Sequence, residues 1–120
     1  MGFLSGRKMK VKIKFAGKEV VVEDVKRVSP IGKVTGLMFR SSNTCALLFE
    51  FEKGRKAIHS FFCRTFLAVW TLDGKVVDYR FVKPFLPLIK PKSDFDKLIE
   101  IPFNSKYTDA INFFTEHGKI

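Results

Sequence analysis

Three polar side chains in the middle of the chain have the chemistry to bind an anion. Arg40 ends the segment GLMFR, while His59 and Arg64 flank the segment SFFC. A guanidinium presents a planar set of donors that matches a carboxylate or a phosphate. If the fold brings Arg40, Arg64 and His59 together, they line a rim pocket for a small ligand or an anionic group. The alternative for Arg40 is structural, with its guanidinium bonded to backbone carbonyls or to a nearby glutamate.

A catalytic pair is a second candidate, because Cys63 could act as a nucleophile and His59 as its base. Residues i and i+4 of a strand lie roughly 13 Å apart, at about 3.3 Å per residue, so the two side chains cannot touch unless the strand bends. The chain also lacks the GxGxxG, P-loop, HExxH and GxSxG motifs. We therefore expect no catalytic residue and a non-enzymatic protein, with an enzyme of unknown reaction as the alternative.

The two cysteines, Cys45 and Cys63, give weak support to a metal site. They do not form a CxxC pair, and no histidine stands at zinc-ligand spacing from them. Both lie in apolar runs, where a free cysteine behaves as a small hydrophobic residue. We expect buried, reduced thiols and no metal or cofactor, while a disulfide stays open.

A row of lysines near the N-terminus suggests nucleic acid as another anionic partner. The net charge is +10, and the basic excess lies in the N-terminal half. In RKMKVKIKF, lysines and apolar residues alternate with the period of two that is typical of a strand with one buried face. Lys10, Lys12 and Lys14 would then share one face with Lys8 and could neutralise phosphates. The alternative is an edge strand that lysines protect against pairing, or simply a solvated face.

These side chains need a scaffold, and the composition predicts one globular domain over residues 1–120. A chain of 120 residues can bury roughly two-thirds of the surface that its unfolded form exposes. Apolar residues make up 46% of it and charged residues 28%, which is typical of a globular protein. No apolar run approaches the roughly 18 residues of a membrane helix. The N-terminus has no apolar core of a signal peptide, so we expect a soluble, cytoplasmic protein that does not bind a membrane.

The periodicity predicts mainly strands, in a β-sandwich or distorted barrel of about seven strands. A first hairpin runs from Lys8 to Glu23, with a turn at Ala16-Gly17. The segment CALLFEFEKGRKAIHSFFCR predicts two strands that meet at Lys53-Gly54. A further hairpin turns at Asp73-Gly74, because this dipeptide adopts the left-handed conformations of a tight turn. Its first arm, residues 66–72, is almost wholly apolar and should be central and covered on both faces.

The C-terminal third predicts a different set of elements. Three prolines keep the segment KPFLPLIKPK out of a central strand, so it should form a long ordered loop. DKLIEI has the length of a last strand. Residues Tyr107, Ala110, Ile111 and Phe114 follow helical spacing, and Gly118 is placed to end this helix. VSPIGKVTGLMFR, with its proline and glycines, should be an irregular connection with a turn of helix.

Several segments in this order resemble a known family. They are GLMFR, then ALLFEF, then IHSFFCRTFLAVWTLDGKVVD. Together they are similar to the family called domain of unknown function 192, or uncharacterised protein family 0127, over about residues 25–102. The resemblance implies a compact, mostly β domain with short helical pieces. It implies no activity, because none is established for the family.

The chain departs from this family within the strand at 66–72. Family members typically carry Pro-x-Asp a few residues after a basic position that corresponds to Arg64, and the matching residues here are Phe66 and Ala68. A role that depends on this acid in relatives would be lost here. We therefore predict a non-enzymatic binding or accessory module for a small or anionic ligand, with nucleic-acid binding and an unknown enzymatic reaction as alternatives.

Overall fold

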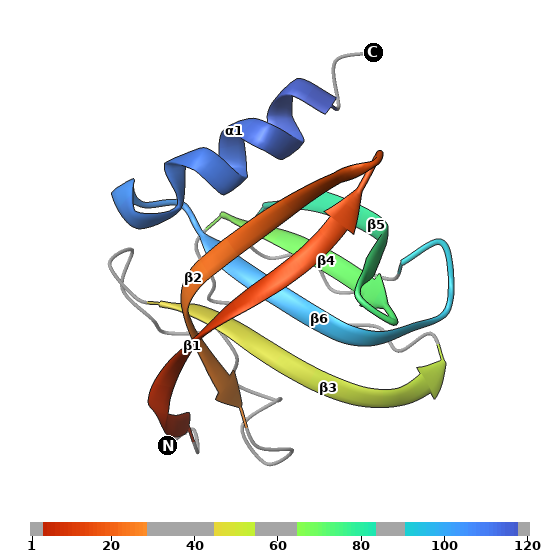
Figure 1. Ribbon diagram of the computed structural model, residues 1–120, viewed down its shortest axis with the longest axis horizontal. Helices are drawn as coiled ribbons and strands as arrows, with labels where there is room; N and C mark the ends of the chain where they lie inside the picture. Colours follow the sequence, from red (N-terminus) through yellow and green to blue (C-terminus); the bar gives the residue numbers. More distant parts are fainter. Residues whose placement is uncertain (1–3, 29–44, 55–64, 84–90, 118–120) are drawn as a thin grey trace.

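The fold of the protein is given by a computed structural model, which describes residues 4–28, 45–54, 65–83 and 91–117. Strands dominate these residues, and a helical segment follows the last of them (Figure 1). The elements are β1 (Leu4–Phe15), β2 (Lys18–Val28), β3 (Ala46–Gly54), β4 (Phe66–Leu72), β5 (Lys75–Val82), β6 (Phe95–Pro102), the 3-10 turn η2 (Ser105–Tyr107) and α1 (Thr108–His117).

The six strands in the described residues close into a barrel in the order β1-β2-β3-β6-β4-β5. Antiparallel pairs join β1 to β2, β3 to β6, and β4 to both β5 and β6. Parallel pairs join β2 to β3 and β1 to β5, the latter through Lys14 and Lys75 alone. The predicted mostly β fold with a C-terminal helix is confirmed, and it is a barrel.

Both predicted hairpin turns are present, and their backbone explains their sequences. Ala16 and Gly17 have φ angles of 54° and 77°, and Asp73 and Gly74 have 52° and 81°. Two successive positive φ angles define a tight turn whose twist matches that of the two strands it joins. The first hairpin is longer than the sequence predicts, because its strands extend to Leu4 and Val28.

The apolar residues form two layers that share the sheet of β3, β6, β4 and β5. One layer fills the barrel and includes residues from every strand and from α1. The second lies on the other side of that sheet, which we call the outer face. Alternate residues of β4 belong to each layer, with Leu67 and Val69 inside and Ala68 and Trp70 outside. All four are 0% exposed, which confirms the prediction that this strand is covered on both faces.

Helix α1 covers the seam between β1 and β5, where strand pairing is shortest. Phe114 is fully buried, and its ring centroid lies 5.6 Å from that of Phe15 on β1 and 4.8 Å from that of Tyr79 on β5. Phe113 also approaches Phe15, at 6.1 Å between centroids. Figure 1 shows the helix running across this end of the barrel. The apolar residues that follow helical spacing in the sequence thus form the face of α1 that packs against the barrel and completes its core.

Other predicted elements are found or fall outside the described residues. DKLIEI lies within β6, as predicted. Three predicted segments lie outside the described residues. They are the partner strand expected after Gly54, the irregular connection from residue 29 onward, and most of the proline-rich loop. In the part of the chain that is described, no helix has the length and apolar character needed to cross a membrane.

Candidate functional site

The residues of the predicted rim pocket, and those of the alternative catalytic pair, lie outside the part of the chain that the structure describes. Arg40, His59, Cys63 and Arg64 all lie outside the described residues. Cys45 is buried at the start of β3 and is a free cysteine. Within the described ranges, no cluster of histidine, cysteine and acidic side chains could hold a metal ion.

The lysine row does form a continuous exposed face on β1. The alternating lysines of this strand are exposed, and the residues between them point toward the core or are half-buried. Ile13, for example, is 1% exposed. We call this surface the lysine face; it consists of Lys8, Lys10, Lys12 and Lys14.

Carboxylates on β2 neutralise part of the lysine face. Lys10 Nζ lies 3.4 Å from Glu23 Oε1, and both side chains are about two-thirds exposed. Glu19 stands opposite Lys14 in the strand register. In the described part of the chain no ion pair involves Lys8, Lys12 or Lys14. The lysine face therefore keeps a positive excess, which Glu23 and Glu19 on β2 reduce.

A β-bulge bends the lysine face at its middle. Lys10 stands opposite two residues of β2, Glu23 and Asp24, where a regular ladder would place one. Asp24 has a φ of 52°, and its carbonyl oxygen accepts a hydrogen bond from the Tyr107 hydroxyl at 2.8 Å. A hollow of about 150 Å³ lies at the bulge. Its lining residues are Lys8, Met9, Lys10, Glu23 and Asp24.

A second group of polar residues lies on the outer face, within the apolar layer. Glu100 of β6 is 7% exposed and is paired with Ala68 of β4. Arg80 of β5 is paired with Ala68 from the other side. A buried carboxylate and a guanidinium thus flank the small side chain of Ala68.

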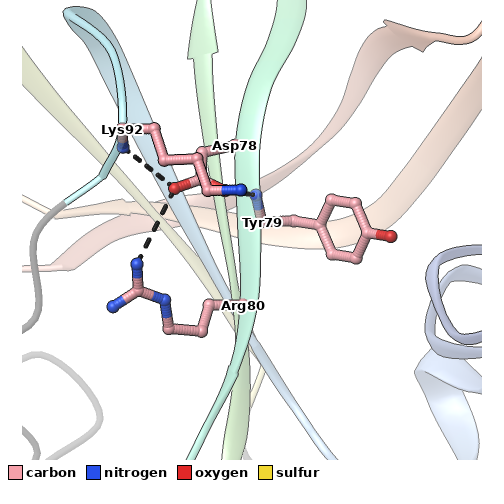
Figure 2. A network of polar contacts seen from close by, with 4 residues as sticks. All are labelled: Asp78, Tyr79, Arg80 and Lys92. Carbon is pink, nitrogen blue, oxygen red and sulfur yellow. Dashed lines mark hydrogen bonds and ion pairs between the residues drawn. The ribbon is translucent and has the colours of Figure 1, made fainter. Parts of the chain in front are cut away.

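Asp78 anchors this polar group to the chain that precedes β6 (Figure 2). Its Oδ1 accepts a hydrogen bond from the Tyr79 backbone N–H at 2.8 Å, and its Oδ2 accepts one from the Lys92 backbone N–H at 3.0 Å. Arg80 Nη2 lies 3.9 Å from Oδ2, and the Asp78 side chain is only 8% exposed. Asp78 therefore has a structural role, since it joins β5 to residue 92 and restrains Arg80.

Trp70 lies at the centre of this polar group. It is 0% exposed and pairs with Asp78 across the β4–β5 ladder. The Arg80 guanidinium carbon lies 6.0 Å from its ring centroid, and the Phe95 ring meets it edge-on at 6.5 Å between centroids. The indole Nε1 is buried and has no hydrogen-bond acceptor among the described residues. Asp96 Oδ1, on β6, is a second buried atom that lacks a partner in this part of the chain.

Sequence reasoning identified the lysine face and missed the outer-face group. The lysines follow one another on a single strand, so their period of two reveals the face directly. Asp78, Arg80 and Glu100 come from β5 and β6, and Trp70 comes from β4. Only the register of three strands brings them together. One feature of the sequence could have indicated this group: the mainly apolar strand KVVDYRFV contains an aspartate and an arginine.

No protein-family model and no curated protein sequence matches the chain. Two solved structures resemble its fold. One is a protein from Sinorhizobium meliloti 1021, provisionally described as a transcription regulator, with a TM-score of 0.68 and 18% sequence identity over 91% of this chain and 90% of that one. The other is a protein of unknown function from Novosphingobium aromaticivorans, with a TM-score of 0.66 and 12% identity over 91% of this chain and 85% of that one. At these identities the likeness concerns the fold alone.

Proposed function

We propose that the chain is a non-enzymatic module that binds anionic partners in the cytoplasm, and that the lysine face is its binding surface. The observation that carries the proposal is the exposure of four lysines on one face of β1. Three of them, Lys8, Lys12 and Lys14, form no ion pair in the described part of the chain. Positive charge arranged along a line is what a polyanion requires of its partner.

The phosphate backbone of a nucleic acid is the partner class that fits this face. Lys8 to Lys14 covers six residue steps, or about 20 Å of extended strand. Each strand of a DNA duplex carries one phosphate per about 3.4 Å of its axis, so several phosphates lie within that span. Such contacts position a nucleic acid without reading its sequence. The exposed apolar residue on the neighbouring strand, Val21, offers no aromatic surface for stacking bases.

Salt-dependent binding tests this function. Fluorescently labelled single-stranded and double-stranded DNA and RNA are titrated with the full chain over a series of salt concentrations. We expect affinity to fall steeply with salt. The double variant Lys12→Gln/Lys14→Gln should reduce the log–log slope by about 2, because each phosphate contact contributes roughly 0.9 to it.

Two further variants control for net charge. Lys92→Gln also removes a positive charge, at an exposed position beyond β5, and it should change binding much less. Glu19→Gln removes the acid opposite Lys14 and should tighten binding. Absence of binding at low salt would refute the proposal, as would an equal effect of Lys92→Gln and Lys12→Gln.

The resemblance to the domain of unknown function 192 family stays a proposal, as does an anion pocket of Arg40, Arg64 and His59. One observation relates to the family resemblance. Glu100 is paired with Ala68, the position where family members typically have their aspartate, so an acid on the neighbouring strand stands beside that position.

A further inference from the structure

We propose that Lys8 and Lys26 together bind the dianion of a phosphate monoester, such as the terminal phosphate of a nucleic acid or of a small phosphorylated compound. Lys8 lies at one end of the lysine face, and Lys26 extends the positive charge onto β2. The inference deepens the proposed function and rests on the same lysine face. It adds a preference that a row of charges does not have, for a phosphate with one ester bond over the doubly esterified phosphates inside a nucleic-acid strand.

The two lysines stand directly opposite each other in the β1–β2 ladder. The next pair in this ladder, Met9 with Val25, belongs to the core of the barrel. Because successive side chains of a strand alternate between its two faces, Lys8 and Lys26 share the outward face. Directly opposed residues have their Cβ atoms about 4.5–5.5 Å apart. Two ammonium groups on such neighbouring side chains can contact one small anion from two sides.

The charges of this pair are not neutralised within the described residues. Like charges that stand directly opposite each other destabilise a sheet. Lys12, by contrast, stands opposite the apolar Val21. Neither Lys8 nor Lys26 forms an ion pair in the described part of the chain. A bound anion removes the repulsion, and a dianion matches both charges where a diester, with its single charge, matches one.

Lys26 is the better anchored member of the pair. Its strand is paired on both sides, with β1 through Lys8 and with β3 through Leu47. Lys26 is half-buried, whereas Lys8 is exposed. A charge that is partly shielded from water is screened less by solvent and salt, so Lys26 should attract an anion more strongly than a fully exposed lysine does. The exposed Lys8 leaves the pair open to solvent on its other side.

The hollow at the β-bulge provides room for a ligand beside Lys8. Its volume of about 150 Å³ is enough for a group of several atoms. Of the two acids that line it, Glu23 is already paired with Lys10 at 3.4 Å. Asp24 is the other, and its carboxylate should limit the affinity for an anion.

Methyl phosphate and dimethyl phosphate form a matched pair of probes. At about pH 8, above the second pKa of about 6 of a phosphate monoester, the first carries two charges and the second carries one. The backbone amide signals of Lys8 and Lys26 in nitrogen-15 NMR report binding at this pair. We expect both signals to shift saturably, with methyl phosphate binding about fivefold more tightly because of its second charge. Equal affinities, or shifts that do not saturate, overturn the proposal.

Three variants locate the site. Lys26→Gln should weaken methyl phosphate binding about tenfold, since it removes one of the two charged donors. Lys12→Gln is the matched control, because it removes an equal charge from the same ladder and should leave the affinity nearly unchanged. Asp24→Asn removes the opposing acid, keeps a residue type that tolerates the φ of 52°, and should tighten binding. Equal losses in the two lysine variants would show that net charge alone governs binding, and would overturn the proposal. If Lys26→Gln fails to fold, the comparison of the two probes on the unaltered chain still decides.

Oligonucleotides with and without a terminal phosphate distinguish the two sources of the ligand. If the source is a nucleic acid, the phosphorylated single strand should bind the full chain more tightly, and Lys26→Gln should abolish the difference. Methyl phosphate binding without such a difference supports the site and assigns it to small phosphorylated compounds. Salt-dependent binding of oligonucleotides without saturable binding of methyl phosphate would retain the proposed function and refute this site. Methyl phosphate binding without any oligonucleotide binding would do the reverse.

Discussion

The hydroxyl of Tyr107 donates a hydrogen bond to the carbonyl oxygen of Asp24 at 2.8 Å. The Tyr107 hydroxyl oxygen in turn accepts a hydrogen bond from the backbone N–H of Ala46 at 2.7 Å. One side chain from the turn η2 thus joins the bulge of β2 to the first residue of β3. Tyr107 is 3% exposed, so water does not replace these contacts, and the hydroxyl holds the bulge that bends the lysine face.

Tyr107→Phe should lower the free energy of unfolding by about 1–3 kcal/mol, because it leaves a buried N–H and a carbonyl without their partner. Chemical denaturation measures the change. Tyr79→Phe is the matched control, since it removes the same atom from a half-buried ring whose hydroxyl makes no hydrogen bond in the described residues. Equal losses in the two variants would contradict the role given to Tyr107.

Stability should fall at high pH because of Tyr107. Burial raises the pKa of the Tyr107 hydroxyl from 10.0 to about 12. The unfolded chain therefore loses this proton at a lower pH than the folded chain does. Stability from this group is intact below pH 10 and decreases as the pH rises toward 12, by at most about 1.4 kcal/mol per pH unit.

Two measurements check this pH dependence. Denaturation at several pH values should show a shallower decline for Tyr107→Phe than for the unaltered chain. The Tyr79→Phe variant leaves Tyr107 as the only tyrosine of the two in the sequence, so its ultraviolet absorbance reports the ionisation of that group. A midpoint near pH 10 in the folded protein would disprove the shift.

Asp78→Ala should destabilise the protein by about 1–3 kcal/mol, because the Lys92 and Tyr79 N–H groups lose their acceptor. Asp78→Asn should cost less, since it retains a carbonyl oxygen that accepts a hydrogen bond. Thermal denaturation compares the two. If Asn proved as costly as Ala, the charge interaction with Arg80 would matter more than the hydrogen bonds.

The first hairpin turn offers a stabilising substitution. Ala16 has a φ of 54°, a left-handed conformation that costs an ordinary residue about 1–2 kcal/mol and that asparagine tolerates better. Ala16→Asn should therefore stabilise the protein by up to about 1 kcal/mol. Gly17→Ala should have the opposite effect: an added Cβ meets no atom within 4 Å, but the φ of 77° strains it. Denaturant midpoints of the two variants should move in opposite directions.

Local signals in the sequence predicted much of this fold. The turns at Ala16-Gly17 and Asp73-Gly74 and the helix around Phe114 depend on neighbouring residues, and all three are confirmed. The strand order could not be predicted in this way. β6 lies between β3 and β4, so it pairs with segments that are distant in the sequence, and no pattern of neighbouring residues indicates such a pairing.

The same distinction applies to the candidate sites. The lysine face is a property of one strand, so alternation in the sequence predicted its exposure. Its two limiting acids and the pair of Glu100 and Arg80 around Ala68 come from strand register, which the sequence does not reveal. The roles proposed for Arg40, Arg64 and His59 stay predictions, because these residues lie outside the described part of the chain.

The position of α1 over the seam between β1 and β5 has a consequence for biosynthesis. β1 is made first, yet the rings that cover Phe15 belong to Phe113 and Phe114. Because the ribosome adds about 5–20 residues per second, the apolar side of the first strand stays uncovered for seconds while the chain emerges. The lysines that alternate with these apolar residues place repelling charges on the same strand during that interval, when nascent chains are most prone to associate.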